Sequence, residues 1–266
     1  QSSADVDFRV ESNGNANMLF VDGGFDGVGI GVAPMDEQDG FTTLRIAGPL
    51  SLSVDSAGVG AGVYMGNNVY RDETNDRWEY VLGDEASQLV QANGAFTFRS
   101  AVAGSANGAI TWVNKFQIAL DGAVTMPLQP AFFVTNSGNQ TIPINAQTTI
   151  VFQTEIFDQN ADFASNTFTA PVAGRYQFNA NLLIQQVDSA SDYVELRLVT
   201  SNRTNDSLYD FGQFNGDLAY WNISHSMLVD MDASDTCILK IGMPNNGTEQ
   251  MVVGQGYAKF SGYLVA

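Results

Sequence analysis

Short apolar runs separated by Asn, Asp and Gly pairs make up the first part of the chain. This pattern predicts strands at 7–10, 18–21 and 28–32. The pairs between them, Asn13-Gly14 and Asp22-Gly23, supply the positive φ angles that hairpin turns require. Runs of about four residues bury too little surface to form a core within one chain. We therefore expect several chains to contribute strands to a shared core.

The same pattern of short apolar runs and turn residues continues from Leu44 to Gly122. The segment 50–54 alternates apolar and polar residues with a period of two, which is typical of a strand with one apolar face. Further strands are predicted at 77–82, 95–99, 110–112 and 116–120. The segment 85–91 is a helix candidate, long enough for two turns at most.

The stretch 126–130 marks the predicted domain boundary, because Pro127 and Pro130 favour an extended connector without ladder hydrogen bonds. We divide the chain into a β-rich, fibre-like shaft or attachment region at 1–126, a proline linker at 127–130 and a head at 131–266. Longer strands follow the linker, and they are predicted at 131–135, 148–153, 166–170, 174–187, 192–200, 219–231, 235–243 and 251–265.

Strands without a convincing helix indicate that the second half folds as two packed sheets. At 193–199, charged residues alternate with apolar ones. This alternation predicts a strand with one wet and one dry face.

The acidic balance of the chain narrows the classes of partner. The 266 residues carry a formal charge of −18, from 29 acidic and 11 basic side chains. Because nucleic-acid binding depends on Lys and Arg neutralising phosphates, we expect no nucleic-acid partner. We interpret the acidic surface as a means of solubility rather than as a specific calcium site. No apolar run approaches the ~20 residues that span a bilayer, so we expect no membrane insertion.

The reactive side chains argue against an enzyme. His225 is the only histidine, and a lone histidine on a strand is more often structural than part of a Ser-His-Asp set. Together with Cys237, which we expect to be a small core residue, it cannot supply the three or four ligands that zinc needs. Glycoside hydrolysis needs two carboxylates, but with 29 acids the sequence favours no particular pair.

The segment 230–235, Asp-Met-Asp-Ala-Ser-Asp, superficially resembles a calcium-binding loop. It lacks the glycine at the sixth position and the distal Glu of such a loop, so we interpret it as a turn between two strands. We therefore expect no metal site and no cofactor, while incidental calcium binding stays open.

The segment 168–178 is similar to the signature of C1q/TNF-like domains, in which an F-T-x-P-x-x-G-x-Y-x-F run joins two adjacent strands. The segment 260–265 resembles the F-S-G-[FY]-L-[LV] ending of the same family, and 131–134 resembles its opening strand. The residues that carry this resemblance, and that we expect in the core or the trimer interface, are Phe168, Pro171, Gly174, Tyr176, Phe178, Phe260, Gly262 and Tyr263.

This resemblance implies an all-β head: a jelly-roll β-sandwich that assembles as a compact homotrimer and binds ligands on its outer or apical loops. The chain has no collagen-like Gly-X-Y stretch before the head. The segments 8–14, 18–24, 28–31 and 109–122 resemble repeats of bacteriophage tail fibres. Together the two resemblances suggest a trimeric fibre with a C1q-like head.

The segment 201–221 is the candidate for recognition. It mixes aromatic faces with short polar groups, a combination that suits sugar or protein surfaces. Its candidate receptor-binding residues are Asn202, Arg203, Asn205, Asp206, Tyr209, Asp210, Gln213, Tyr220 and Trp221. The alternative is that Phe211, Phe214 and Tyr220 simply pack in the trimer core.

We interpret the chain as a non-enzymatic structural fibre or spike protein of a virion surface, extracellular and homotrimeric. Its head would bind a glycan or protein on a host surface, and its first half would contact other virion proteins. One alternative is a purely structural capsid or tail component whose head acts as a trimerisation clamp. A less favoured one is a polysaccharide-degrading tailspike.

Overall fold

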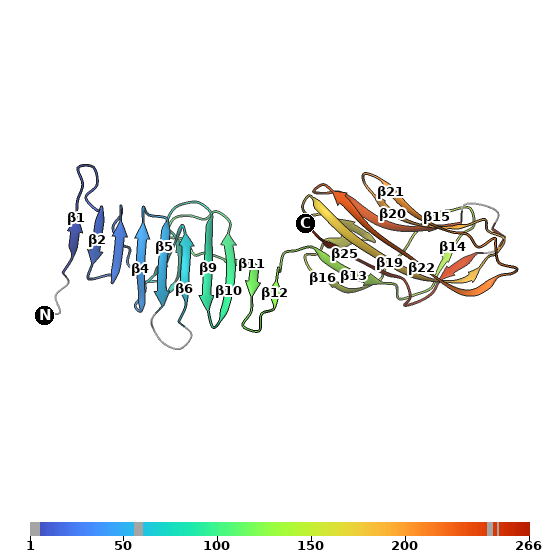
Figure 1. Ribbon diagram of the computed structural model, residues 1–266, viewed down its shortest axis with the longest axis horizontal. Helices are drawn as coiled ribbons and strands as arrows, with labels where there is room; N and C mark the ends of the chain where they lie inside the picture. Colours follow the sequence, from blue (N-terminus) through green and yellow to red (C-terminus); the bar gives the residue numbers. More distant parts are fainter. Residues whose placement is uncertain (1–5, 56–60, 244–246, 249) are drawn as a thin grey trace. The chain divides into compact units, whose positions relative to one another are not determined.

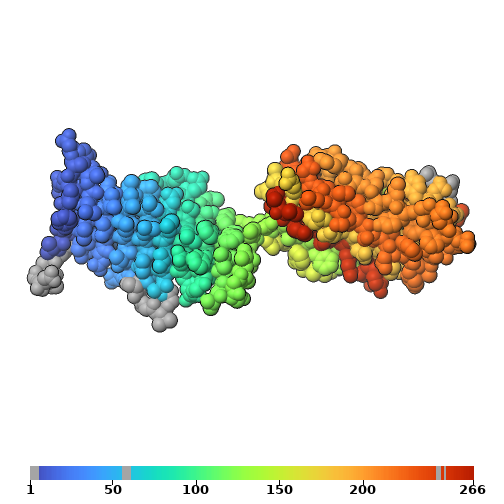
Figure 2. Space-filling view, viewed as in Figure 1, coloured from blue at the N-terminus to red at the C-terminus, as the bar shows by residue number. Residues whose placement is uncertain are grey.

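The computed structural model describes residues 6–55, 61–243, 247–248 and 250–266, and every helix or strand in them is a β-strand (Figure 1). The all-β fold is therefore confirmed for this part of the chain. Two compact units are present, Gln1–Pro127 and Leu128–Ala266. Each unit has its own strands and is a continuous body in the space-filling view (Figure 2).

The first unit is built on one ten-stranded sheet. Its strands in spatial order are β1 (Phe8–Val10), β2 (Leu19–Asp22), β3 (Gly27–Ile30), β4 (Phe41–Ile46), β5 (Leu50–Asp55), β6 (Val63–Asn67), β9 (Ala86–Ala92), β10 (Ala95–Ala101), β11 (Val113–Ile118) and β12 (Val124–Thr125). Neighbours are antiparallel except β3 and β4, which are parallel. The connection 31–40 consequently crosses one face of the sheet.

A separate hairpin, β7 (Val69–Asp72) and β8 (Arg77–Tyr80), lies against one face of this sheet, which we call the covered face. Small residues allow the close approach: a Cβ on Gly66 would lie 2.3 Å from a methyl of Val69, and the Ser51 hydroxyl donates to the Val69 carbonyl at 3.4 Å. A small core forms here from Val69, Tyr80, Ala86 and Ala101, with Trp78, Ile110 and Trp112 packed around it.

A buried ion pair connects the crossing segment to the covered face. Arg45 and Glu37 are joined at 2.6 Å, and their side chains are only 1% and 2% exposed. The second carboxylate oxygen of Glu37 accepts from the Arg71 backbone N–H at 2.8 Å. Burial raises the pKa of Glu37, and the positive charge of Arg45 opposes this shift. The pair therefore ties 31–40, β4 and the hairpin together.

The second unit is a two-sheet sandwich. One sheet has the order β14 (Gln140–Ile142), β24 (Met251–Val253), β19 (Gly174–Val187), β25 (Lys259–Leu264), β13 (Ala131–Thr135) and β16 (Thr154–Asp158), with β22 (Leu218–Met231) paired to β19. The other has the order β17 (Phe163–Ala164), β18 (Thr167–Thr169), β23 (Thr236–Gly242), β20 (Val194–Thr200) and β21 (Thr204–Tyr209), with β15 (Gln147–Thr149) paired to β23. The predicted jelly-roll sandwich is confirmed.

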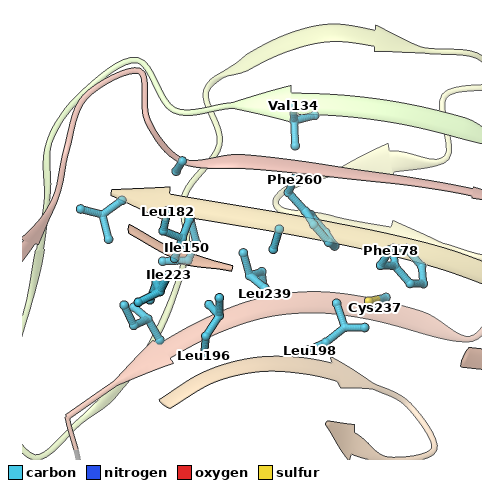
Figure 3. Close-up of a cluster of buried hydrophobic side chains, with 14 of the residues drawn as sticks. Val134, Ile150, Phe178, Leu182, Leu196, Leu198, Ile223, Cys237, Leu239 and Phe260 are labelled. Carbon is cyan, nitrogen blue, oxygen red and sulfur yellow. The ribbon is translucent and has the colours of Figure 1, made fainter. Parts of the chain in front are cut away.

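The family-like signature residues form the centre of this sandwich. Phe168, Tyr176, Phe178 and Phe260 are all at most 1% exposed. The three phenylalanine rings contact the Phe132 ring, and the Tyr176 ring contacts those of Phe168 and Phe178. Figure 3 shows Phe178, Phe260 and Cys237 in the same buried cluster. A Cβ on Gly262 would lie 2.5 Å from the Phe178 ring, so only glycine fits opposite it. Tyr263, in contrast, is exposed, and Pro171 lies at the exposed turn before β19.

Several predicted elements are wrong. The helix candidate 85–91 is strand β9, because pairing with β6 and β10 on both sides overrides its weak helical preference. The predicted strand 110–112 is an irregular segment that packs Ile110 and Trp112 on the covered face. The run 251–265 is divided by residues 254–258 into β24 and β25, and only the start of 148–153 is a strand.

At 193–199 the predicted dry face is confirmed, because Val194, Leu196 and Leu198 are buried, whereas the face predicted to be wet is half-buried. The Glu195 side chain is 8% exposed and pairs with Arg197 at 2.7 Å, while Gln147 donates to the same carboxylate at 2.5 Å. The short strands β14, β16, β17 and β21 were not predicted, and β21 lies beside β20 along its length. The alternation of charged residues on β20 therefore indicates a half-buried ion pair rather than a fully solvated surface.

Replacing Arg45 by Met tests the role of the buried pair. The substitution leaves the Glu37 carboxylate buried without its partner, and we expect it to lower the free energy of unfolding of the first unit by about 3–5 kcal/mol. The measurement is denaturant unfolding of the full chain. Arg9→Met removes the exposed pair with Glu11 and should change stability by about 1 kcal/mol or less. Equal losses in both variants would contradict a structural role for Arg45.

Candidate functional site

The candidate recognition residues do not form one site. They follow the turn 201–203, strand β21, the connection 210–217 and the start of β22. The six residues of β21 separate the two ends of this segment by about 20 Å. The structure therefore divides the set into three parts. These are the turn 201–203, which we call the turn end, the strand β21, and residues 210–221, which we call the tip.

At the turn end, the polar groups bind each other. Asn202 donates to the Asp235 carboxylate at 2.6 Å, and Arg203 pairs with Asp230 at 2.7 Å. Asp235 also accepts from the backbone N–H of Asp232 at 2.8 Å. The segment 230–235 is thus the turn between β22 and β23, as predicted. No group of three or more His, Cys, Asp and Glu side chains within the described residues is placed to hold a metal ion.

The residues on β21 are directed at neighbouring strands. Asp206 pairs with Arg197 of β20 at 3.4 Å, and the Tyr209 hydroxyl accepts from the Ser224 backbone N–H at 2.9 Å. Asn205 has a buried side-chain nitrogen without a hydrogen-bond partner among the described residues. Asp206 and Tyr209 thus connect strands within the protomer, and the unpaired nitrogen of Asn205 is buried rather than presented to a receptor.

The tip combines aromatic rings with an exposed edge. Phe211 is buried in the core, while Trp221 is 39% exposed and meets the Phe214 ring edge-on at 5.4 Å. Tyr220 is 63% exposed on the outer face of β22. Asp210 accepts from Gly212 and Gln213 at 3.0 and 3.2 Å, which shapes the connection. The tip is therefore the part of 201–221 that presents a surface suited to an external ligand.

His225 lies buried on β22. Its Nδ1 is hydrogen-bonded to the Ser207 hydroxyl between β21 and β22, and the residue is 6% exposed. Its Nε2 is buried and has no partner among the described residues. Burial lowers the pKa of His225, and the negative charge of Asp206 opposes this shift. The neutral imidazole is a structural link between two strands.

A second surface lies on the first unit, on the side of the sheet opposite the hairpin, which we call the open face. Cross-strand pairing aligns apolar residues in an unbroken row over nine strands: Phe8, Val21, Val28, Leu44, Leu52, Met65, Leu89, Phe98 and Phe116. A parallel row of Val10, Leu19, Ile30, Ile46 and Leu50 lies next to it.

The open face is apolar and largely accessible in the protomer. Phe8 is 58% exposed, Met65 52% and Phe98 46%. Eight gaps of about 4.8 Å make the long row roughly 38 Å in length. Contiguous apolar patches of this extent on a soluble protein mark interaction surfaces. The sequence signalled this surface only as alternation at 50–54; the register that joins the strands into rows is a property of the fold.

The described residues include no helix with the length and apolar character that crossing a bilayer requires.

Comparison with known proteins gives one family match, to the C1q domain, over residues 131–265. Among solved structures, the globular domain of zebrafish complement 1qA protein aligns with 21% sequence identity and a TM-score of 0.42, and the alignment covers 52% of this chain and 98% of that one. Murine APRIL at pH 8.5 aligns with 9% identity, a TM-score of 0.38 and coverage of 52% and 99%. No curated protein matches the chain.

The structural role of His225 can be tested through the pH dependence of stability. Because its folded pKa is lower than its unfolded pKa, the unfolded state binds more protons, and stability falls as the pH drops below about 6.5. His225→Asn keeps a hydrogen-bonding group toward Ser207 and removes this titration. We expect wild type to lose more stability than the variant between pH 7.5 and 5, measured by thermal unfolding. Parallel pH profiles would contradict this interpretation.

Proposed function

The chain belongs to the C1q domain family, and we propose that it is a homotrimeric, non-enzymatic fibre or spike protein of a virion surface. Its second unit is a head of the C1q/TNF type. The observation that carries the proposal is the open face of the first unit, which a single copy leaves in contact with water. The family match supports association of the head only. The open face supports association of the first unit, independently of the head.

Association through the open face has a clear driving force. Removing apolar surface from water contributes roughly 25 cal/mol per Å². Stable domains cover the apolar face of a sheet with a second layer, and the described residues of this unit supply such a layer on the covered face only. Three copies around a threefold axis would place each open face against the other two. The threefold order follows from the homotrimer that the C1q-type head implies.

Charge does not oppose this packing. The two apolar rows contain no charged residue, although the chain carries a formal charge of −18. The acidic side chains of the assembled first units would remain on surfaces turned to solvent. Repulsion between acidic side chains is therefore kept away from these rows, and the basic side chain of Lys115 lies beside them, where it lines a pocket with Met65 and Phe98.

The tip of the head is the proposed receptor contact. Gln213, Phe214, Tyr220 and Trp221 combine an exposed aromatic surface with a polar side chain, which suits a glycan or a protein on a host cell. We further propose that residues 1–126 form the shaft and bind other virion proteins, in line with their resemblance to tail-fibre repeats. The protein would accordingly be extracellular.

The clamp alternative is favoured by the internal pairing of the other candidates. Asn202, Arg203 and Tyr209 bind groups of the same chain, as the preceding distances show. A head that only closes the trimer would need no free recognition surface. In that case the exposed tip would bind no host cell, and the fibre would be a purely structural component.

Trimerisation can be tested on the full chain. Sedimentation equilibrium should give three times the protomer mass of 28.6 kDa. Leu52→Asp places a charge in the middle of the open face, and we expect it to lower the free energy of unfolding by about 3 kcal/mol or more per protomer, because the charge would be buried between copies.

Thr111→Asp is the matched control, because Thr111 is exposed on the segment that crosses the covered face. It adds the same charge and should leave stability within about 0.5 kcal/mol of wild type. A stable monomer, or a Leu52→Asp variant as stable as the control, would overturn association through the open face.

Receptor binding can be tested with fluorescently labelled protein on a panel of bacterial strains. We expect adsorption to at least one strain, and Trp221→Ala should weaken it about tenfold or more, as removal of a central aromatic contact typically does. Asn202→Ala should leave adsorption unchanged. Absence of adsorption to every strain would favour the clamp alternative.

A further inference from the structure

A pocket of about 350 Å³ lies on the covered side of the first unit, away from the open face. Its lining is Gln38, Asp39, Phe41, Asp55, Tyr64, Arg71 and Trp78. These residues come from the crossing segment, the strands β4, β5 and β6, and the hairpin. Phe41 is paired with Asp55 across β4 and β5, and Arg71 with Trp78 across the hairpin. Segments distant in sequence therefore converge on one concave site.

Three aromatic rings form one wall of this pocket. The Tyr64 ring centroid lies 5.1 Å from that of Trp78, and the Phe41 centroid lies 5.8 and 5.9 Å from those of Tyr64 and Trp78. The rings are tilted at 34°, 54° and 88° to one another, so they form one packed aromatic cluster at the pocket. Gly62 leaves room for Tyr64, since a Cβ there would lie 2.5 Å from the tyrosine hydroxyl.

Two polar residues of the pocket, Arg71 and Asp39, are hydrogen-bonded to neighbouring residues. The Arg71 Nε donates to the Gln38 side-chain oxygen at 2.6 Å, and a terminal guanidinium nitrogen of Arg71 pairs with Asp76. The Arg71 backbone is in turn held by buried Glu37. Asp39 is fixed through its backbone N–H, which donates to Glu73 at 2.5 Å. The pocket therefore contains a hydrogen-bond donor, Arg71, and an acceptor, Asp39, that are both positioned by neighbouring residues.

We propose that this pocket binds a neutral sugar ring. The apolar C–H face of a sugar can lie on the aromatic wall, while its hydroxyls can donate to Asp39 and Asp55 and accept from Arg71. Two carboxylates disfavour an anionic ligand. A quaternary ammonium ion would use the rings and the carboxylates, but its positive charge would share the pocket with the Arg71 guanidinium, and it has no atom that accepts a hydrogen bond from Arg71.

The site goes beyond the proposed function, which places receptor binding at the tip of the head. Tyr64 projects from the opposite side of β6 to Val63 and Met65, so packing of open faces would leave the pocket accessible. Sugar binding here does not depend on trimerisation. A monomeric protein could still bind the ligand, and a trimeric protein could fail to bind it.

The test uses the full-length chain and four neutral probes: the methyl glycosides of glucose, galactose, mannose and N-acetylglucosamine. Saturation-transfer NMR should detect binding of at least one of them. Asp39→Ala should weaken that binding about tenfold, and Trp78→Ala should abolish it. Asp36→Ala is the matched control, because Asp36 is an exposed carboxylate close in sequence that does not line the pocket.

Thermal unfolding of each variant shows whether it is folded, and Tyr64→Phe offers a milder change than Trp78→Ala at the same wall. Sugar binding that is lost in Asp39→Ala and retained in Asp36→Ala would support the proposal. Failure of all four glycosides to bind would overturn it. Binding that survives both Asp39→Ala and Trp78→Ala would also overturn it, as would a pocket that takes choline in place of sugars.

Discussion

A single β-sheet has two faces, and the first unit supplies cover for one of them. The hairpin of β7 and β8 and the crossing segment close the covered face around a small core and a buried ion pair. The open face has apolar rows and no second layer from the described part of the unit. Exposed apolar surface of this extent is unfavourable in water, so the first unit would gain stability from association through the open face, whereas the head has a large core of its own.

The two faces also differ in how precisely they define the fold. Apolar contacts are not directional, so the open face alone would tolerate a shift of strands along their axes. The covered face adds directional contacts: Arg45 to Glu37, Ser51 to the hairpin and Thr43 to Ser53 at 3.0 Å. A misaligned strand would separate these buried polar groups from their partners at a cost of about 1–3 kcal/mol each. Polar pairing on one side thereby fixes the register of the apolar rows on the other.

The elements that could be predicted from the sequence are those that a run of consecutive residues specifies. The strand predicted at 174–187 is confirmed as β19, and the family-like segment 168–178 places Tyr176 and Phe178 in the core as expected. The parallel pairing of β3 and β4 could not be predicted, because it depends on a connection crossing the sheet rather than on either strand. The same limit applies to the aromatic pocket. Phe41, Tyr64 and Trp78 are far apart in sequence, and no motif joins them before the hairpin folds back.

The alternation along β6 has a consequence for how this protein can change. Val63 and Met65 belong to the open face, while Tyr64 between them lines the pocket. Single substitutions on β6 can alter the pocket or the open face separately, because neighbouring residues project to opposite sides. An insertion or deletion of one residue within the strand would instead exchange the two sides at once. A replacement along β6 can therefore leave one of its two sides intact, whereas a change in the length of the strand cannot.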